Sequence, residues 1–182
     1  MMILKWLGLL PVMVVADLAT IFFAPIAAAL SMGSDALPKW LRWMQTHDNP
    51  LDALWQQPRH LKGYSWLNDK KPEDFERSAW LRWQARMLWL IRNPAYGLGI
   101  RFGYETNGEK PRVLAHHGQW DSDKTNWLVL RWRGAFQVRA QIFYPFAKSY
   151  FLRIYIGWKS TDGKPRLMYA GHVNPFRKWK AR

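Results

Sequence analysis

The sequence predicts an α+β protein in which an apolar N-terminal helix and short amphipathic helices precede an antiparallel β-meander of about six strands. Three observations predict it: a long apolar run at the start, a middle segment with helical periodicity, and a second half in which apolar residues alternate with period two. On these patterns the chain divides into a hydrophobic membrane anchor (1–32), a tryptophan-rich connector with short helices (33–72), and a helix-plus-sheet domain (73–182).

Composition points to polyanionic partners. The 182 residues contain 27 Lys and Arg against 13 Asp and Glu, which gives a net charge of +14. Such an excess favours acidic lipid headgroups or nucleic acid. The 13 Trp and 7 Tyr suit either partner, since these rings anchor at membrane interfaces and stack on bases. The absence of Cys excludes a disulfide framework, a thiol nucleophile and a Cys-based zinc site.

The apolar run from Trp6 to Leu30 is long enough to cross a bilayer. As a helix it measures about 37 Å, against about 30 Å for a hydrocarbon core. Asp17 lies at its midpoint, where an acid costs roughly 2.5–3.5 kcal/mol. We therefore expect Asp17 to make an intramembrane contact with water, a host membrane protein or a second copy of the chain.

Two alternatives to a spanning anchor stay open. Ala27-Ala28-Ala29 resembles a signal-peptide cleavage site, and Pro11 and Pro25 divide the run as they would in a re-entrant or surface-lying segment. Orientation follows the basic flanks, because cytoplasmic loops carry the excess of Lys and Arg. One lysine precedes the run and four cations follow it, which places the C-terminal domain in the cytoplasm; they are Lys5, and then Lys39, Arg42, Arg59 and Lys62.

The connector contains two short helix signals. Trp40 and Trp43 are three residues apart on a short helix, which suits either an interfacial helix or packing on the downstream domain. Further on, the donors of the segment 47–52 permit a metal or acid–base hypothesis. Helix capping is favoured instead, with Asn49 as N-cap, Pro50 at N1 and Asp52 at N3.

The segment 73–93 is predicted to be one amphipathic helix that opens after Pro72 and closes at Asn93-Pro94. Its apolar stripe comprises Ala79, Trp80, Trp83, Met87, Leu90 and Ile91. Its arginines, Arg86 among them, are expected on the polar side. Leu88 and Trp89 fall off the stripe, so we expect the helix to contact apolar material on two sides.

The remaining chain is predicted to be the meander. Alternation over 96–105 predicts a first strand, which the type I′ turn Asn107-Gly108 would join to the next. A three-residue loop from Arg133 to Ala135 would pair Trp132 with Phe136. One sheet face then gathers polar and cationic side chains, namely Arg131, Arg133, Gln137, Arg139, Gln141, Arg153, Tyr155 and His172. This face is either solvated or a binding surface for acidic lipid, protein or a nucleic-acid backbone.

Three stretches carry a family resemblance. Residues 43–52 (WMQTHDNPLD) and 89–97 (WLIRNPAYG), with the central acid of Asp17–Thr20, resemble motifs of an uncharacterised family of phage and prophage membrane-associated proteins. The resemblance implies phage origin and membrane association and supplies no catalytic residue. His47 and Ala53-Leu54 depart from the family pattern, which weakens a metal or catalytic role for that loop. The motif residues of unknown role are Asp48, Asn49, Pro50, Asp52, Arg92, Asn93, Pro94, Tyr96 and Gly97.

No catalytic or cofactor motif is found. His116 and His117 would point to opposite faces of a strand, and the segment 121–126 lacks the glycine and glutamate of a calcium loop. We therefore expect a non-enzymatic, phage-type protein of the host bacterial inner membrane, without metal or cofactor. Its cytoplasmic domain would bind the anionic leaflet or a host membrane protein, for example in superinfection exclusion. The alternatives are a membrane-tethered nucleic-acid-binding protein and a small metal-dependent hydrolase using Asp48, Asp52 and a histidine.

Overall fold

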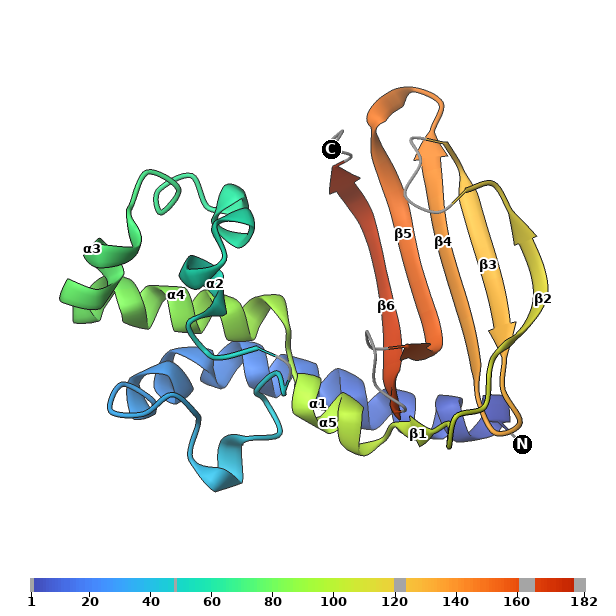
Figure 1. The fold of residues 1–182 in the computed structure, drawn as a ribbon, viewed down its shortest axis with the longest axis horizontal. Coiled ribbons are helices and arrows are strands. Elements are labelled where there is room, and N and C mark those ends of the chain that lie inside the picture. Colours follow the sequence, from blue (N-terminus) through green and yellow to red (C-terminus); the bar gives the residue numbers. More distant parts are fainter. Residues whose placement is uncertain (1, 48, 120–123, 161–165, 179–182) are drawn as a thin grey trace. The chain divides into compact units, whose positions relative to one another are not determined.

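The computed structural model describes residues 2–47, 49–119, 124–160 and 166–178, and they form two compact units (Figure 1). The sheet unit comprises residues 1–10 and 99–182, and the helical unit comprises residues 11–98. Helix α1 (Met2–Leu30) contributes its first residues to the sheet unit and the rest to the helical unit. The predicted α+β class, with a long apolar N-terminal helix and a six-stranded antiparallel sheet, is confirmed.

Short helices make up the rest of the helical unit. They are η1 (Lys39–Leu41), α2 (Ala53–Gln56), η2 (Pro58–Gly63), α3 (Pro72–Arg77), α4 (Ala79–Arg92) and the first residues of α5 (Tyr96–Arg101). The helix predicted over 73–93 is confirmed in extent but breaks at Ser78, which has an extended backbone and whose Oγ accepts from the Leu81 amide at 3.3 Å. A serine that caps a new helix stops the preceding one because its own backbone must leave the helical region.

Two hydrophobic clusters form the core of the helical unit, and α4 contributes to both. The first cluster comprises Ala53, Leu54, Trp55, Leu61, Leu67, Phe75, Ala85 and Trp89. The second comprises Ala24, Ala27, Leu37, Leu41, Met44, Leu51 and Leu90. The expectation that α4 contacts apolar material on two sides is thus confirmed. The predicted single stripe is only partly right, because Trp80 is 62% exposed.

The last five strands of the sheet run as a meander, and the short first strand pairs with the last one (Figure 1). The strands are β1 (Tyr104–Glu105), β2 (Arg112–His117), β3 (Asn126–Arg131), β4 (Phe136–Tyr144), β5 (Ala147–Ser160) and β6 (Arg166–Lys178). The spatial order is β1-β6-β5-β4-β3-β2, and every neighbouring pair is antiparallel.

The strand predicted over 96–105 is wrong for most of its length. Residues 96–101 form α5, and only Tyr104–Glu105 remains extended. The Asn107-Gly108 turn does form, with φ of 50° and 80° and a 2.8 Å bond from the Glu109 amide to the Thr106 carbonyl. It does not make the predicted hairpin, because β1 pairs with β6 while β2 pairs with β3.

The predicted β3–β4 register is wrong by one residue. Arg131, rather than Trp132, lies opposite Phe136, and the Trp132 amide bonds to the Ala135 carbonyl across a two-residue turn. The Tyr104 ring packs on Gly134 in this turn, where an added Cβ would lie 2.4 Å from a ring carbon. A one-residue slip moves every β3 side chain to the other face.

Trp6 of α1 packs on the apolar face of the sheet. Its indole stacks on the Tyr169 ring with centroids 5.9 Å apart, and it meets Phe136 edge-on at 6.4 Å. The indole N–H donates to the Ala170 carbonyl at 2.9 Å, and the Tyr169 hydroxyl donates to the Trp6 carbonyl at 3.2 Å. The start of α1 is therefore an integral part of the sheet unit's core.

Candidate functional site

The face of α1 that carries most of its large apolar side chains is bare. Twelve of these side chains are between 42% and 78% exposed: Ile3, Leu4, Leu7, Val12, Val14, Val15, Leu18, Ile21, Phe22, Phe23, Ile26 and Leu30. By length and composition α1 is the one described helix able to cross a membrane, and it lies near the N-terminus, where signal sequences also lie. Soluble monomers rarely leave so many apolar residues together in water, so this face is a candidate contact surface.

The opposite face of α1 is packed against the protein through a stripe of mainly small residues. The residues of this docked stripe are Trp6, Met13, Ala16, Thr20, Ala24, Ala27 and Ala28, all 9% exposed or less. Successive side chains of a helix are rotated by about 100° around its axis. On this measure the mean direction of the docked stripe lies roughly 180° from that of the exposed apolar side chains. Half-buried Asp17 borders this stripe, so the central acid of the apolar run lies on the protein side of α1.

Three polar contacts join α1 and the residue that follows it to the rest of the helical unit. The Trp83 indole N–H donates to the Pro25 carbonyl at 2.9 Å, and the Ala95 amide donates to the Thr20 hydroxyl at 3.1 Å. Below the end of α1, the Arg86 guanidinium donates to the Ser31 carbonyl. Carbonyls at a helix C-terminus lack partners within the helix, so a cation there satisfies one of them and complements the helix dipole.

Arg86 and Asp52 form a buried ion pair. Arg86 Nε donates to Asp52 Oδ1 and Arg86 Nη2 to Asp52 Oδ2, each at 2.7 Å, and the two residues are 2% and 8% exposed. Arg86 Nη1 also donates to the Ser34 carbonyl at 2.9 Å. Both predictions for these residues are wrong. Arg86 is in the core. Helix α2 begins at Ala53, so Asp52 is at the N-cap position rather than N3, and Asn49 and Pro50 precede the helix instead of starting it. The pair holds together the end of α1, the 46–52 loop and α4.

The segments that carry the family resemblance meet one another. The Leu98 amide donates to the Trp43 carbonyl at 2.9 Å, and the Trp89 indole donates to the Thr46 hydroxyl at 3.3 Å. The third stretch joins them through the bond from Ala95 to Thr20. Gly97 makes this approach possible, because a Cβ there would lie 2.5 Å from the Arg42 carbonyl oxygen. The motif segments therefore form part of the surface against which α1 packs.

The other motif residues have structural partners as well. Asn49 Oδ1 accepts from the side-chain Nε2 of Gln57 at 2.9 Å, and the Asn93 side chain donates to the Trp89 carbonyl at 3.1 Å. Arg92 donates to the His60 carbonyl at 3.2 Å and lies over the Trp89 ring. Pro94 ends α4, and Tyr96 begins α5. Asp48 lies outside the described residues.

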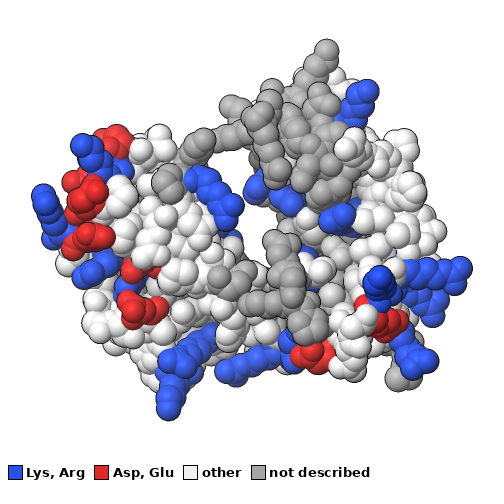
Figure 2. Space-filling model, in the orientation of Figure 1, with Lys and Arg blue, Asp and Glu red and all other residues white. Residues whose placement is uncertain are grey.

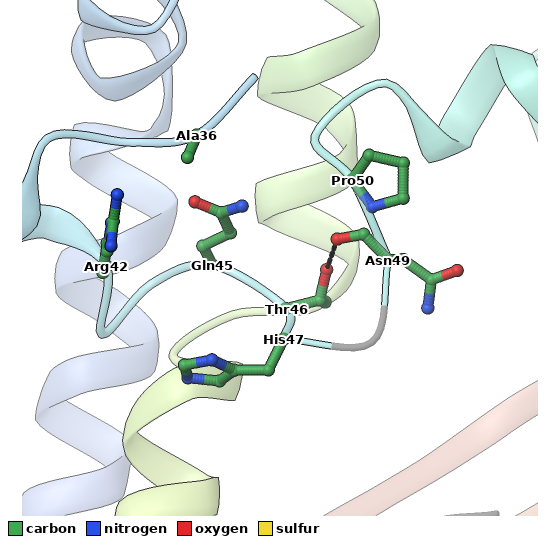
Figure 3. Close-up of a pocket in the computed structure, with 7 residues that line it drawn as sticks. All are labelled: Ala36, Arg42, Gln45, Thr46, His47, Asn49 and Pro50. Carbon is green, nitrogen blue, oxygen red and sulfur yellow. Dashed lines mark hydrogen bonds between the residues drawn. The ribbon is translucent and has the colours of Figure 1, made fainter. Parts of the chain in front are cut away.

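A cavity of about 430 Å³ opens beside the motif loop (Figure 3). Figure 3 shows Gln45 between Arg42 and Pro50, with His47 below it. Several lining groups are already bonded: Gln45 Oε1 accepts from the Leu37 amide, and the Thr46 hydroxyl donates to the Asn49 carbonyl, both at 2.9 Å. Asp52, two residues after Pro50, is turned to Arg86 instead. The described lining thus offers no carboxylate for acid–base chemistry.

The sheet brings together six of the eight residues predicted to share its polar face, namely Gln137, Arg139, Gln141, Arg153, Tyr155 and His172. Arg139, Tyr155 and His172 are direct neighbours on β4, β5 and β6, and Arg153 donates to the Tyr155 hydroxyl at 2.9 Å. Arg131 belongs to the opposite face because of the register shift, and Arg133 lies in the turn, where its amide donates to Glu109 at 2.7 Å. Figure 2 shows Lys and Arg dispersed over the visible surface.

The aromatic group on this face is not available for base stacking. Tyr155 is 7% exposed, with the Arg153 guanidinium 5.0 Å above its ring and the His172 ring 5.0 Å away. The polar side chains beside it, Asn126, Gln137 and Gln141, are 3% exposed or less. β-Sheets that bind single-stranded nucleic acid stack the bases on solvent-exposed aromatic rings. The buried Tyr155 ring therefore gives the nucleic-acid alternative no specific support.

His172 should remain neutral well below pH 7. Partial desolvation, together with Lys159, Arg153 and Arg177, lowers its pKa to about 4. We expect an NMR titration of its imidazole to have a midpoint near 4, so acidification from pH 7 to 5 adds no charge at this position. The variant Arg153→Gln, which removes one like charge, should raise the midpoint; a wild-type midpoint above 6.5 would contradict the expectation.

Within the described part of the chain, no three His, Asp or Glu side chains gather as metal ligands. His116 and His117 are consecutive on β2, and Asp121 and Asp123 lie outside the described residues. Three features of the site escaped the sequence analysis: the ion pair of Arg86 with Asp52, the packing of Trp6 on the sheet, and the stacked rings of Trp80 and Trp83 beside Pro25. The apolar residues on either side of Arg86 are a sequence signal for its burial, although they do not indicate Asp52 as its partner, and Trp80 and Trp83 are three residues apart on the predicted stripe.

The protein thus combines an apolar helix with one docked face, a group of motif residues with structural roles, and a sheet with one polar face. The chain belongs to DUF7338, a family of unknown function whose model matches residues 1–181. No curated protein and no solved structure gives a significant match.

Proposed function

We propose that the protein is a membrane-attached, non-enzymatic binding protein held at a bilayer by the bare face of α1. The observation that carries the proposal is the row of twelve exposed apolar side chains on that face. Transferring half of each from water to lipid would contribute about 1 kcal/mol per side chain, hence on the order of 10 kcal/mol in all. That is ample for stable attachment.

Retention of α1 in the mature protein fits this proposal better than its cleavage as a signal peptide. A cut after Ala27-Ala28-Ala29 would remove Ala24 and Ala27 from the second cluster and Trp6 from the sheet. The folded units would then expose their cores. A retained helix keeps both cores closed and still offers an apolar face.

Charge and family resemblance suggest which membrane is bound. The +14 net charge favours an anionic leaflet, and the cations after α1 favour the cytoplasmic side. The resemblance of the motif segments to phage and prophage proteins makes the bacterial inner membrane of a host the proposed location. A host membrane protein is then the proposed target, as in superinfection exclusion or other interference with the host.

Vesicle flotation of the full chain tests the attachment. The wild type should float with vesicles containing anionic lipid, whereas the double variant Phe22→Glu, Ile26→Glu should lose at least tenfold in affinity, because each charge must enter the apolar layer. Both positions are exposed (78% and 56%), so the fold should persist, which circular dichroism can verify.

The matched control places the same charges on exposed apolar residues of β2. Val113→Glu, Leu114→Glu changes side chains that are 51% and 49% exposed. This variant should float like the wild type. Wild-type protein that stays at the bottom of the gradient, or equal loss in both double variants, would refute the proposed attachment through α1.

A further inference from the structure

We propose that α1 lies in the plane of the membrane and touches lipid along one face, rather than crossing the bilayer. This inference rests on the proposed membrane attachment and specifies its geometry. The lipid-contact surface is the bare face defined above, and its partner is the interfacial layer of a bilayer, where apolar side chains reach acyl chains and flanking groups meet headgroups.

The two faces of α1 differ along the whole of its part in the helical unit. There the docked stripe runs from Met13 to Ala28, and the bare face runs opposite to it from Val12 to Leu30. A crossing helix meets lipid or other transmembrane protein at every depth. A helix with one face docked throughout and the other bare matches an in-plane helix, whose boundary between apolar and polar surroundings runs parallel to its axis.

The protein packed against α1 is too polar to sit at bilayer depth. Thr20, close to the middle of the apolar run, is bonded to Ala95, three residues after the exposed Arg92. The Arg86–Asp52 pair lies against the end of the helix. A perpendicular α1 would carry these groups into hydrocarbon, where each central arginine costs roughly 2.5–3.5 kcal/mol on the insertion scale.

The backbone beside α1 leads to the same conclusion. Leu37, Leu41 and Met44, which pack on Ala24 and Ala27, belong to a loop with one short 3₁₀ turn. Lipid tolerates non-helical backbone only where protein or water covers it. Lys39 and Arg42 in this loop are exposed, so the loop itself faces water or headgroups.

Two tryptophans of α4 lie next to α1 near its C-terminal end. Trp83 donates to the Pro25 carbonyl and stacks on Trp80 at a centroid distance of 4.8 Å, and Trp80 is 62% exposed. The pair therefore lies beside Pro25 of α1. Indoles prefer the headgroup boundary, where the ring is in apolar surroundings and the N–H has a partner.

The position of Asp17 fits an in-plane helix. The acid borders the docked stripe rather than the bare face. It therefore needs no intramembrane partner of the kind expected for a spanning segment, since it remains on the protein side of the lipid boundary.

Spin-label depth measurements on the full chain test the geometry. The chain has no native Cys, so single substitutions at Leu4, Val15, Leu18, Phe22 and Ile26 give specific labels on the bare face. In anionic vesicles an in-plane helix should place all five labels at one shallow depth, about 5–10 Å below the headgroups. A label at Leu114 on β2 is the control and should remain in water.

The outcomes separate this inference from the proposed function. Equal shallow depths support the in-plane helix. A depth profile that is deepest at Val15 and Leu18 and shallow at Leu4 and Ile26 would overturn it and leave membrane attachment intact. Five labels that stay in water, or that couple to labels of a second copy without lipid contact, would overturn both.

Discussion

Replacing Asp52 with asparagine is expected to lower the free energy of unfolding by about 3–5 kcal/mol, the range for removing one partner of a buried ion pair. The change keeps the shape of the side chain but leaves the Arg86 guanidinium, 2% exposed, without its counter-charge. Because Arg86 also binds the Ser31 and Ser34 carbonyls, the end of α1 should loosen at the same time. Urea unfolding followed by tryptophan fluorescence measures the loss.

The control for Asp52 is an acid that pairs with a lysine at the surface. Asp69 lies 3.2 Å from Lys70, and its side chain is 70% exposed. Asp69→Asn should change the free energy of unfolding by less than about 1 kcal/mol. The double variant Asp52→Leu, Arg86→Met should recover part of the loss, since neither charge then remains buried. A loss below 1 kcal/mol in Asp52→Asn would show that water reaches the pair.

Replacing Gly97 with alanine is expected to destabilise the protein by about 2–3 kcal/mol, although helix propensity alone would stabilise it by up to about 1 kcal/mol. Gly97 lies in α5, and an added Cβ would approach the carbonyl oxygens of Arg42, Trp43 and Gln45 to 2.5, 3.0 and 3.0 Å. Backbone atoms cannot escape by changing rotamer, so the two motif segments must move apart. The bond from the Leu98 amide to the Trp43 carbonyl should then lengthen or break.

Gly33→Ala provides the matched comparison, because no atom lies within 4 Å of the added Cβ. It should change stability by no more than about 0.5 kcal/mol. Amide hydrogen exchange at Leu98 gives a second measure that reports the contact itself. Faster exchange in Gly97→Ala but not in Gly33→Ala is expected. Stabilisation by Gly97→Ala would mean that propensity outweighs the close approach.

Features with a strong local signal could be predicted from the sequence. The apolar run gives α1, the proline and acids at 72–74 give the start of α3, and Asn107-Gly108 gives its turn. Each depends on neighbours in the chain. The strand predicted over 96–105 shows the limit of such signals: its alternating glycines suit a strand, but they serve here to let backbone approach backbone at Gly97 and Gly103.

The register of β3 could not be predicted, because both of its faces are apolar. Trp127 and Val129 alternate with Leu128 and Leu130, so hydrophobic pattern permits either face to meet the core. The observed register accompanies a two-residue turn between Trp132 and Ala135, where Tyr104, 30 positions earlier in the chain, packs on Gly134. This error placed Arg131 on the wrong face of the sheet.

The candidate site was recognised as a set of motifs, but its role was not. Asn49, Pro50 and Asp52 are residue types that favour the start of a helix. In the structure, however, the Asp52 carboxylate pairs with Arg86, 34 positions away, instead of interacting with a helix end. A single sequence gives no indication of that pairing. The sequence predicts that α1 is apolar. It does not predict which face is docked, because that face is identified only by the packing of its small residues on the second cluster.

The contact between Trp6 and the last strand has a consequence for biosynthesis. Trp6 and Ala170 are 164 positions apart, so at 5–20 residues per second roughly 10–30 s pass between the synthesis of the helix and that of its strand. During that interval the apolar segment has no native partner in the sheet. A bilayer reached in this period would shelter it, and the sheet would then close onto a helix already resting on lipid.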